Sequence, residues 1–221
     1  ALARKLLESI RDNKHVRDIR IGLNAASDAT REYVHTWAAR QLTRQPVYIY
    51  QPRENVNVGK YPLMRQMFCH GDLAGRIMWF DDDSYVDPSA GIEWWDRAHK
   101  VSSSRTQVGA IHSIMQRSRQ HEVIVQQPWY NRKPLNARHR FKFITGGWWI
   151  GSSALIRKWD YPWADIYHNG GDSMLGELMR QQGHELVSFP GGQQCHCESC
   201  DKQNNKYGAP VAHINVGGRN G

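Results

Sequence analysis

The chain has 221 residues, of which 40% are hydrophobic and 23% charged, proportions that fit one large globular domain. No apolar stretch approaches the roughly 18–20 residues that a membrane-spanning helix needs, and we expect no signal peptide. Four cysteines in this length do not make a disulfide scaffold. The formal net charge of +8 favours a polyanionic partner, or merely provides solubility. We expect a cytoplasmic protein.

Hydrophobic periodicity predicts helices and strands that alternate along the chain. The predicted helices cover 2–12, a segment from Thr30, 61–70, a segment from Pro88 and a segment that opens at 169–173. The predicted strands cover 19–23, 47–50, 76–80, 108–114 and 185–189. This alternation predicts an α/β fold with a mostly parallel central sheet flanked by helices in residues 1–190. Residues 191–221, rich in Gly, Asn, Gln and Cys, are predicted to form a lid or an irregular C-terminal extension.

Three consecutive carboxylates, Asp81, Asp82 and Asp83, follow the apolar run of the strand at 76–80. A buried strand that delivers acids to its C-terminal end has this pattern, and ligands of open α/β sheets bind at that end. Three adjacent acids repel one another unless a cation or hydrogen-bond donors offset their charge. The run therefore predicts either a metal or donor site, or a solvated turn.

The segment from Arg105 to Lys142 carries nearly the whole positive excess of the chain, and Glu122 is its only acid. Its basic residues are Arg105, Arg117, Arg119, Arg132, Lys133, Arg138, Arg140 and Lys142. Lys and Arg gain free energy by releasing the counterions of a polyphosphate, and aromatic rings such as Trp129 can stack on bases. The segment predicts a phosphate-rich partner, with a solvated basic face as the alternative.

Paired glycines, Gly146 and Gly147, allow the backbone to approach a ligand or another strand closely. Trp148 and Trp149 follow directly and are predicted either to form a wall for a sugar ring or to fill the core. Further on, Asp172 stands at or near the start of a predicted helix. Helix capping is the structural interpretation of Asp172, and catalysis is the functional one.

A cysteine cluster lies in the tail, where Cys195, Cys197 and Cys200 are separated by one and two residues. Together with His196 or His213, these thiols could form a structural zinc site. The second half of the usual paired spacing is missing from the sequence.

Five motifs, in this order, resemble those of the family 2-like glycosyltransferases of GT-A fold, and the resemblance runs from about Leu2 to Phe189. The first is the leucine-rich helix that ends in Glu8-Ser9-Ile10. The others are the loop 24–30, the Asn-x-Gly turn at 57–59 before Lys60, the acidic motif at 80–83, and the helix start at 171–175 with Arg180 to Gly183 at its end.

The sequence departs from the family pattern in three places. The family usually opens with a strand that ends in Pro-x-x-Asn and contacts the nucleotide; no counterpart stands in this sequence, so that strand is missing or the chain is a fragment. Asn24 stands where an acid is common, so the resemblance leaves the identity of the nucleotide open. Gly171 stands where Glu is common, so only Asp172 remains of that acidic pair.

The resemblance implies a metal-dependent glycosyltransferase that uses a nucleotide sugar, most simply a UDP-sugar, and inverts the anomeric carbon. Asp81 and Asp83, with His213, would hold Mn²⁺ or Mg²⁺, which neutralises the leaving diphosphate. Asp172 would be the general base. The implied donor-binding residues are Asn24, Ser27, Asp28, Lys60 and Asp82, and Arg65 could also reach phosphates. If a structural Zn²⁺ takes His213, the catalytic ion loses that ligand.

The acceptor is expected to dock between the acidic motif and the helix of Asp172. The expected acceptor-binding residues are Arg132, Lys133, Arg138, Arg140, Gly146, Gly147, Trp148 and Trp149. Their charge favours a hydroxymethylated pyrimidine in DNA, as modified by phage-type DNA glycosyltransferases, in which case the protein acts in the host cytoplasm. A target inside a duplex would have to be flipped out. The alternatives are a transferase acting on cell-surface polysaccharide or glycolipid, and a non-catalytic nucleic-acid-binding module.

Overall fold

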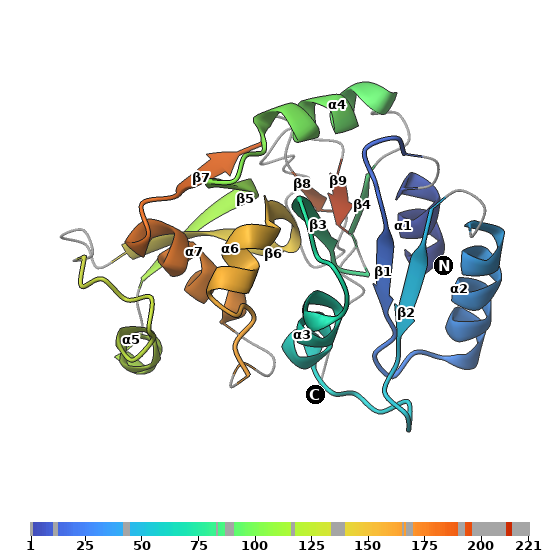
Figure 1. The fold of residues 1–221 in the computed structure, drawn as a ribbon, viewed down its shortest axis with the longest axis horizontal. Coiled ribbons are helices and arrows are strands. Elements are labelled where there is room, and N and C mark those ends of the chain that lie inside the picture. Colours follow the sequence, from blue (N-terminus) through green and yellow to red (C-terminus); the bar gives the residue numbers. More distant parts are fainter. Residues whose placement is uncertain are drawn as a thin grey trace.

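The computed structural model describes residues 2–10, 13–41, 45–82, 84–86, 91–115, 118–133, 140–164, 166, 170–189, 193–195 and 211–213. Helices and strands alternate along much of this length (Figure 1). The helices are α1 (Leu2–Ile10), α2 (Asp28–Gln41), α3 (Lys60–Cys69), α4 (Gly91–Val101), α5 (Ser118–Val125), α6 (Ser153–Lys158) and α7 (Gly171–Gln181). No helix within these ranges is long and apolar enough to cross a membrane.

The strands form three sheets. They are β1 (Ile19–Gly22), β2 (Val47–Tyr50), β3 (Arg76–Phe80), β4 (Ser84–Val86), β5 (Thr106–Met115), β6 (Arg140–Ser152), β7 (Glu185–Ser188), β8 (Gln193–Cys195) and β9 (Val211–His213). β1 and β2 pair in parallel, β3-β6-β5-β7 form a four-stranded sheet, and β4-β9-β8 form a three-stranded one. The α/β class is confirmed. In the predicted C-terminal extension, β9 pairs with β4 of the preceding domain, and β8 pairs with β9.

The prediction that the strands of the central sheet pair mostly in parallel is wrong. β6 lies between β3 and β5 and is antiparallel to both, while β5 and β7 are parallel. Three strands of this sheet therefore point in one direction and β6 in the other. Hydrophobic periodicity marks a strand but carries no information on its direction, which is set by the tertiary connection that delivers it.

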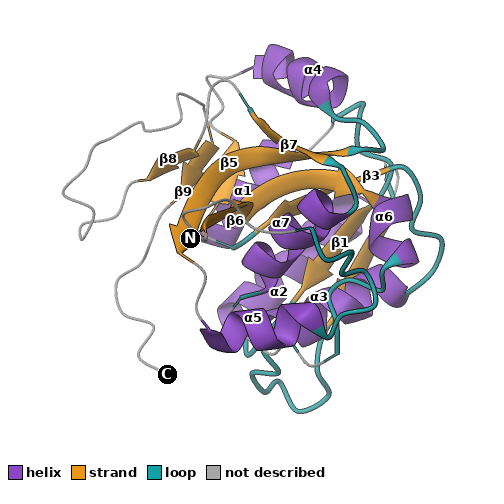
Figure 2. Cartoon of the chain, turned by 90° about the vertical axis from the view of Figure 1, so that its left-hand side faces the viewer, coloured by secondary structure: helices purple, strands orange, loops and turns teal. Residues whose placement is uncertain are grey.

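Helices cover both faces of the four-stranded sheet. Successive side chains of β6 point to opposite faces, so neighbouring residues of this strand pack against different helices. Trp149 packs with residues of α3, α6 and α7 on one face, and Trp148 packs with Trp94 of α4 and Phe189 on the other. Figure 2 shows α4 on one side of this sheet and α6 and α7 on the other. Both indoles are fully buried, so they fill the core rather than line an acceptor site. Trp129, the other indole considered for stacking, is also fully buried.

The β1–β2 pair has a core of its own beside the four-stranded sheet. Leu7 of α1 and Val34, Trp37 and Ala38 of α2 pack against Ile19 of β1. The helices predicted over 2–12 and from Thr30 are thus present as α1 and α2. The predicted bounds of β3 agree with the structure residue for residue, and those of α3 and β7 agree to within one.

Candidate functional site

The C-terminal end of β3 delivers Asp81 next to a cation. The backbone N–H of Asp81 donates to the carbonyl of Gly147 in β6, at 2.8 Å, and this bond continues the β3–β6 ladder up to the acid. Lys60 Nζ lies 2.8 Å from Oδ1 and 2.9 Å from Oδ2 of Asp81. The indole Nε1–H of Trp79 donates to Oδ1 at 2.8 Å. The carboxylate is thus held by one cation and one neutral donor.

The surroundings of Asp81 favour the protonated form of its carboxyl group over the charged form. Burial raises the pKa of the Asp81 carboxyl above its ordinary value, and the charge of Asp172 raises it further, although Lys60 and the Trp79 indole act to lower it. The side chains of Lys60 and Asp81 are 20% and 25% exposed. Charges this poorly hydrated interact more strongly with each other, or with an ion that replaces one of them, than charges on the open surface.

Lys60 owes its position to two asparagines. The side chain of Asn24, just after β1, donates from Nδ2 to Oδ1 of Asn57 at 2.8 Å and accepts from the backbone N–H of Val58 at 2.9 Å. Oδ1 of Asn57 also accepts from the N–H of Gly59 at 2.9 Å. Gly59 has φ 87° and precedes the first residue of α3, Lys60. The predicted Asn-x-Gly turn therefore exists, and it aims Lys60 at Asp81.

Asp172 lies in the first turn of α7, and it is not the N-cap. Gly170 occupies that position, with φ 90°. The hydroxyl of Tyr61 in α3 donates to Oδ1 of Asp172 at 2.8 Å. A Cβ at Gly171 would lie 2.3 Å from Cζ of Tyr61, so the absence of a side chain at 171 leaves the room that the Tyr61 ring occupies.

Two buried tyrosines connect the two carboxylates. Burial raises the pKa of the Tyr61 hydroxyl far above its ordinary value, and the charges of Asp172 and Asp81 both raise it further. Tyr161 is also buried, and the same two carboxylates raise its pKa in the same direction. Its hydroxyl has no hydrogen-bond partner among the described residues. Asp81 and Asp172, far apart in the sequence, therefore lie around one pair of tyrosines.

A cavity of about 1610 Å³ opens beside Asp81. Asn24, Lys60, Asp81 and Asp82 line its polar end, so four of the residues expected to bind the donor or its metal border one space. Asp82 is exposed there. This space is larger than the roughly 300–1,000 Å³ of ordinary small-molecule sites.

The other donor-binding residues named above have structural roles in the described contacts. Ser27 Oγ accepts from the backbone N–H of Thr30 at 3.3 Å, as an N-cap of α2 does. Asp28 forms an ion pair with Arg31 one turn later. Arg65 binds Oδ2 of Asp160 at 2.7 Å and the carbonyl of Pro162 at 2.8 Å, so it holds the segment that carries Tyr161 rather than facing a phosphate.

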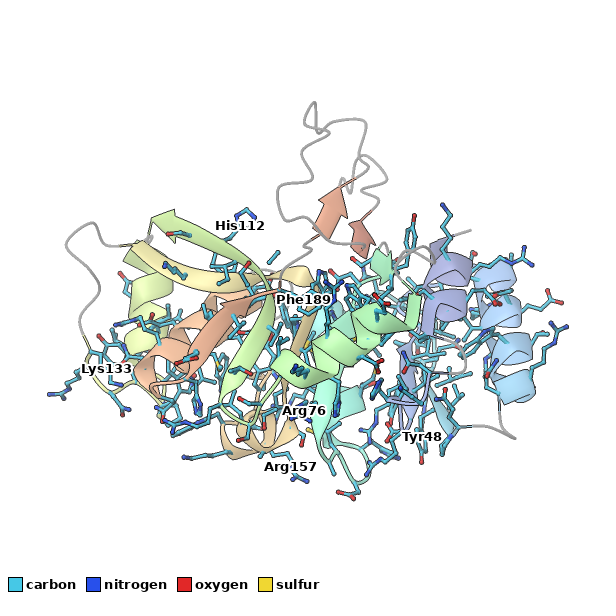
Figure 3. All side chains as sticks on the ribbon, turned by 90° about the horizontal axis from the view of Figure 1, so that it is seen from above. Tyr48, Arg76, His112, Lys133, Arg157 and Phe189 are labelled. Carbon is cyan, nitrogen blue, oxygen red and sulfur yellow. The ribbon has the colours of Figure 1, made fainter. Side chains whose placement is uncertain are left out.

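The expected acceptor residues are spread over the molecule. Arg132 and Lys133 are exposed, and Lys133 lies at the end of the molecule remote from Tyr48 (Figure 3). The carbonyl of Lys133 accepts from Nε2 of Gln181 in α7 at 3.0 Å, so this loop is tied to the helix of Asp172. Gly146 lies within β6, and Arg140 begins that strand. Arg138 lies outside the described residues.

The metal-binding residues named above are described only in part. Asp83, Cys197, Cys200 and His196 lie outside the described residues. The backbone of His213 in β9 is paired with Ser84, the residue directly after the acidic run, and Cys195 is the register partner of His213 on the other side. His213 is therefore brought next to the acidic motif, and Cys195 next to His213. Within the described part of the chain, no group of three or more His, Cys, Asp or Glu could hold a metal ion.

The residues around Asp81 fit a bound cation in one respect. Both carboxylate oxygens of Asp81 already contact the ammonium group of Lys60, so the site favours positive charge at this position. A divalent ion would need further oxygen ligands next to Asp81. Asp83 and His213 are the candidates that the sequence and the β4–β9 register supply.

Tyr61, Tyr161, Trp79 and Asn57 take part in the site although only the turn at Asn57 was singled out in the sequence. Nothing in the sequence pattern pointed to Tyr61, whose ring lies against Gly171 in the structure. Comparison with models of known protein families gives no match to the chain, and comparison with curated protein sequences gives none either. The function has to be argued from the site itself.

Proposed function

We propose that the protein is a metal-dependent glycosyltransferase of GT-A type that moves a sugar from a nucleotide diphosphate sugar to an acceptor hydroxyl. The observation that carries this proposal is a pair of carboxylates held by neighbouring residues of α3, with Asp81 bound to Lys60 and lining a cavity of about 1610 Å³, and Asp172 bound to Tyr61. Glycosyl transfer needs neutralisation of a leaving diphosphate and removal of a proton from the acceptor. Asp81, which already binds a cation, lies where the diphosphate is to be neutralised. Asp172 is the carboxylate that would take the proton from the acceptor.

The donor end of the site is the Asp81 side. Lys60 can turn its ammonium group from Asp81 to a phosphate oxygen, since a Lys side chain is a flexible point charge. Asp82, exposed in the cavity, is the candidate for a contact with the ribose or the sugar. Bound Mn²⁺ or Mg²⁺ would be held by Asp81 and Asp83, with His213, and would supply Lewis-acid stabilisation of the diphosphate.

The acceptor end is the Asp172 side. The carboxylate takes the proton from the acceptor hydroxyl as that oxygen attacks the anomeric carbon, and the C–O bond to the diphosphate breaks. Attack from the face opposite the leaving group inverts that carbon. The hydrogen bond from Tyr61 occupies Oδ1 of Asp172 and orients the carboxylate, so Oδ2 is the oxygen we assign to the proton transfer.

Turnover of nucleotide sugars tests this function. We expect Mn²⁺-dependent release of a nucleoside diphosphate from at least one UDP-, GDP- or TDP-sugar, lost with a chelator and reduced at least 100-fold in Asp81→Asn and Asp172→Asn. Asp72→Asn is the matched control, because its side chain is 79% exposed and its carboxylate pairs with Arg157 outside the proposed site. No release with any donor, or equal rates in all three variants, would overturn the proposal and favour a binding module.

For the acceptor we propose 5-hydroxymethylpyrimidine in DNA, on the basis of the basic segment and of the exposed Arg132 and Lys133 beside α7. Mass analysis of nucleosides, after incubation of hydroxymethylated DNA with the donors that show turnover, tests this choice. A mass increase equal to the sugar residue of the donor is expected on the modified nucleoside. Donor turnover without any such increase would reject the DNA acceptor and leave a polysaccharide or glycolipid acceptor.

A further inference from the structure

The ammonium group of Lys60 occupies a position that favours a cation in two ways. It contacts both carboxylate oxygens of Asp81, at 2.8 Å and 2.9 Å. It also lies over two aromatic rings, 5.7 Å from the centroid of the Tyr61 ring and 5.8 Å from that of the Trp79 ring. The faces of such rings attract positive charge. One carboxylate and two rings therefore contribute to the same cation position.

The carboxylate at this position is fixed, whereas the ammonium group can move. The backbone N–H of Asp81 donates to the carbonyl of Gly147 at 2.8 Å, and the indole of Trp79 donates to Oδ1 of Asp81 at the same distance. The turn before α3 holds the backbone of Lys60. The side chain of Lys60, however, is a flexible four-carbon stem and lines the cavity. Lys60 can therefore transfer its charge from Asp81 into the cavity without a change in the backbone.

The ammonium group stands in the way of a divalent cation at Asp81. Mg²⁺ binds carboxylate oxygens at about 2.0–2.1 Å. Since Nζ of Lys60 is within 2.9 Å of both oxygens of Asp81, an ion bound to either oxygen would lie at most about 5 Å from Nζ. Like charges at this distance repel, and the repulsion is poorly screened because both side chains are mostly shielded from water. The two cations therefore compete for one carboxylate.

We propose that Lys60 competes with the divalent cation for Asp81 and holds its place until phosphate oxygens draw the ammonium group into the cavity. In the protein without ligands, the ammonium group neutralises Asp81. When a diphosphate binds, Lys60 turns to the phosphate and Asp81 becomes available to the metal ion, so that each ligand promotes binding of the other. This inference rests on the proposed function for the identity of the two ligands. It adds that Lys60 keeps the affinity for the metal ion low in the absence of the donor.

Binding of Mn²⁺ to the protein, measured from the electron paramagnetic resonance signal of free Mn²⁺, tests this competition without any turnover. In the absence of nucleotide, we expect Lys60→Met to bind Mn²⁺ at least about tenfold more tightly than the wild type. Lys60→Gln, a second neutral variant, should show the same gain, and Lys60→Arg, which keeps the charge, should stay within about threefold of the wild type. Saturating UDP should then tighten Mn²⁺ binding at least about fivefold more in the wild type than in Lys60→Met, after subtraction of the Mn²⁺ that UDP holds in protein-free samples.

Two control variants show whether the effect belongs to Asp81. Lys158 is exposed and, like Lys60, lies over an indole ring, 4.8 Å from the centroid of Trp159. Lys158→Met therefore removes an equivalent charge from a residue that does not line the cavity, and Mn²⁺ affinity should stay within about twofold. Adding Asp81→Asn to Lys60→Met should cancel the gain in Mn²⁺ affinity, because the contested carboxylate is gone.

Each other outcome contradicts a stated part of the inference. No gain in Lys60→Met and Lys60→Gln, an equal gain in Lys158→Met, or a gain that survives Asp81→Asn would overturn the competition. Equal effects of UDP in the wild type and Lys60→Met, including none in either, would overturn the part played by phosphate. Tighter Mn²⁺ binding in Lys60→Met without turnover of any nucleotide sugar would reject the proposed function and retain the competition, whereas turnover without tighter binding would do the reverse.

Discussion

At the scale of single residues, Lys60 and Asp81 form an ion pair that is only about one-quarter exposed to water. Burial raises the pKa of Asp81, so its charged form is less stable in the fold than in the unfolded chain. For an acid with a raised folded pKa, the contribution to stability is largest below the unfolded pKa and is lost as pH rises through the folded pKa. Lys60 limits that loss.

We therefore predict that Lys60→Met lowers the free energy of unfolding more at pH 7 than at pH 4. At pH 7 the cost is about 1–3 kcal/mol, below the 3–5 kcal/mol of a fully buried pair because water reaches both groups. Denaturant unfolding followed by Trp fluorescence measures it, and Lys60→Arg, which keeps the charge, is the control. A pH-independent cost would contradict the account of the pair.

Gly171 and Tyr61 are complementary in shape, since a Cβ at 171 would fall within 2.3 Å of the Tyr61 ring. Gly171→Ala is predicted to destabilise the fold by about 1–3 kcal/mol through overpacking. In a Tyr61→Leu background the same change should cost less than about 0.5 kcal/mol, because the ring is gone. A double-mutant cycle by chemical denaturation gives the coupling energy, and additive costs would show that the two residues do not compete for this space.

The sequence allowed prediction of the charged residues of the site but not of their neighbours. Asp81 and Asp172 were identifiable because an acidic run after a strand and an acid at a helix start have known chemistry. Tyr61 and Tyr161 were not, because an aromatic residue in an apolar pattern has the same appearance whether it fills a core or contacts a carboxylate. Trp148 and Trp149 show the converse, since their position after two glycines suggested a sugar site and the structure buries them.

At the scale of elements, α7 connects the candidate base to the basic loop. Gln181 in its last turn is fully buried and accepts from the backbone N–H of Asn131 at 3.0 Å and of Lys133 at 3.2 Å. It also donates to Glu177 Oε1 at 2.8 Å. The same helix thus presents Asp172 at its start and anchors the loop of Arg132 at its end.

We predict that Gln181→Met, which keeps the length of the side chain but removes four hydrogen bonds, destabilises the protein by about 1–3 kcal/mol. Amides of residues 131–133 should lose their protection from hydrogen exchange. Gln126→Met is the matched control, because Gln126 is exposed. Unchanged exchange at 131–133 in Gln181→Met would show that the loop is held by other contacts.

Elements with strong local signals were predictable, and those defined by pairing were not. The strand at 76–80 agrees with the structure because an apolar run between a Gly and three acids has two clear ends. β6 is 13 residues long and antiparallel to both its neighbours, and only its apolar stretch with the paired glycines was visible in the pattern. Its direction follows from the path of the chain through residues that make no periodic signal.

At the scale of the whole molecule, the excess of positive charge lies in one segment, which the proposed acceptor should contact. Binding of a hydroxymethylated DNA duplex is predicted to weaken linearly in a plot of log K against log salt concentration. Arg132→Ala with Lys133→Ala should reduce the magnitude of this slope by about 2, since each phosphate contact contributes about 0.9. Arg40→Ala, an exposed arginine of α2, should leave it unchanged, and equal slopes in all proteins would argue against contact through this loop.

The central claim is that Asp81 serves the donor and Asp172 serves the acceptor within one reaction. Steady-state release of nucleoside diphosphate, with donor concentration varied at saturating Mn²⁺ and acceptor, separates the two roles. We predict that Asp172→Asn lowers kcat by about 10²–10⁴ with the donor KM within about threefold, as loss of a general base requires. Asp81→Asn is predicted to raise the donor KM at least about tenfold. Wild-type kcat in Asp172→Asn, or an unchanged donor KM in Asp81→Asn, would contradict this division of roles.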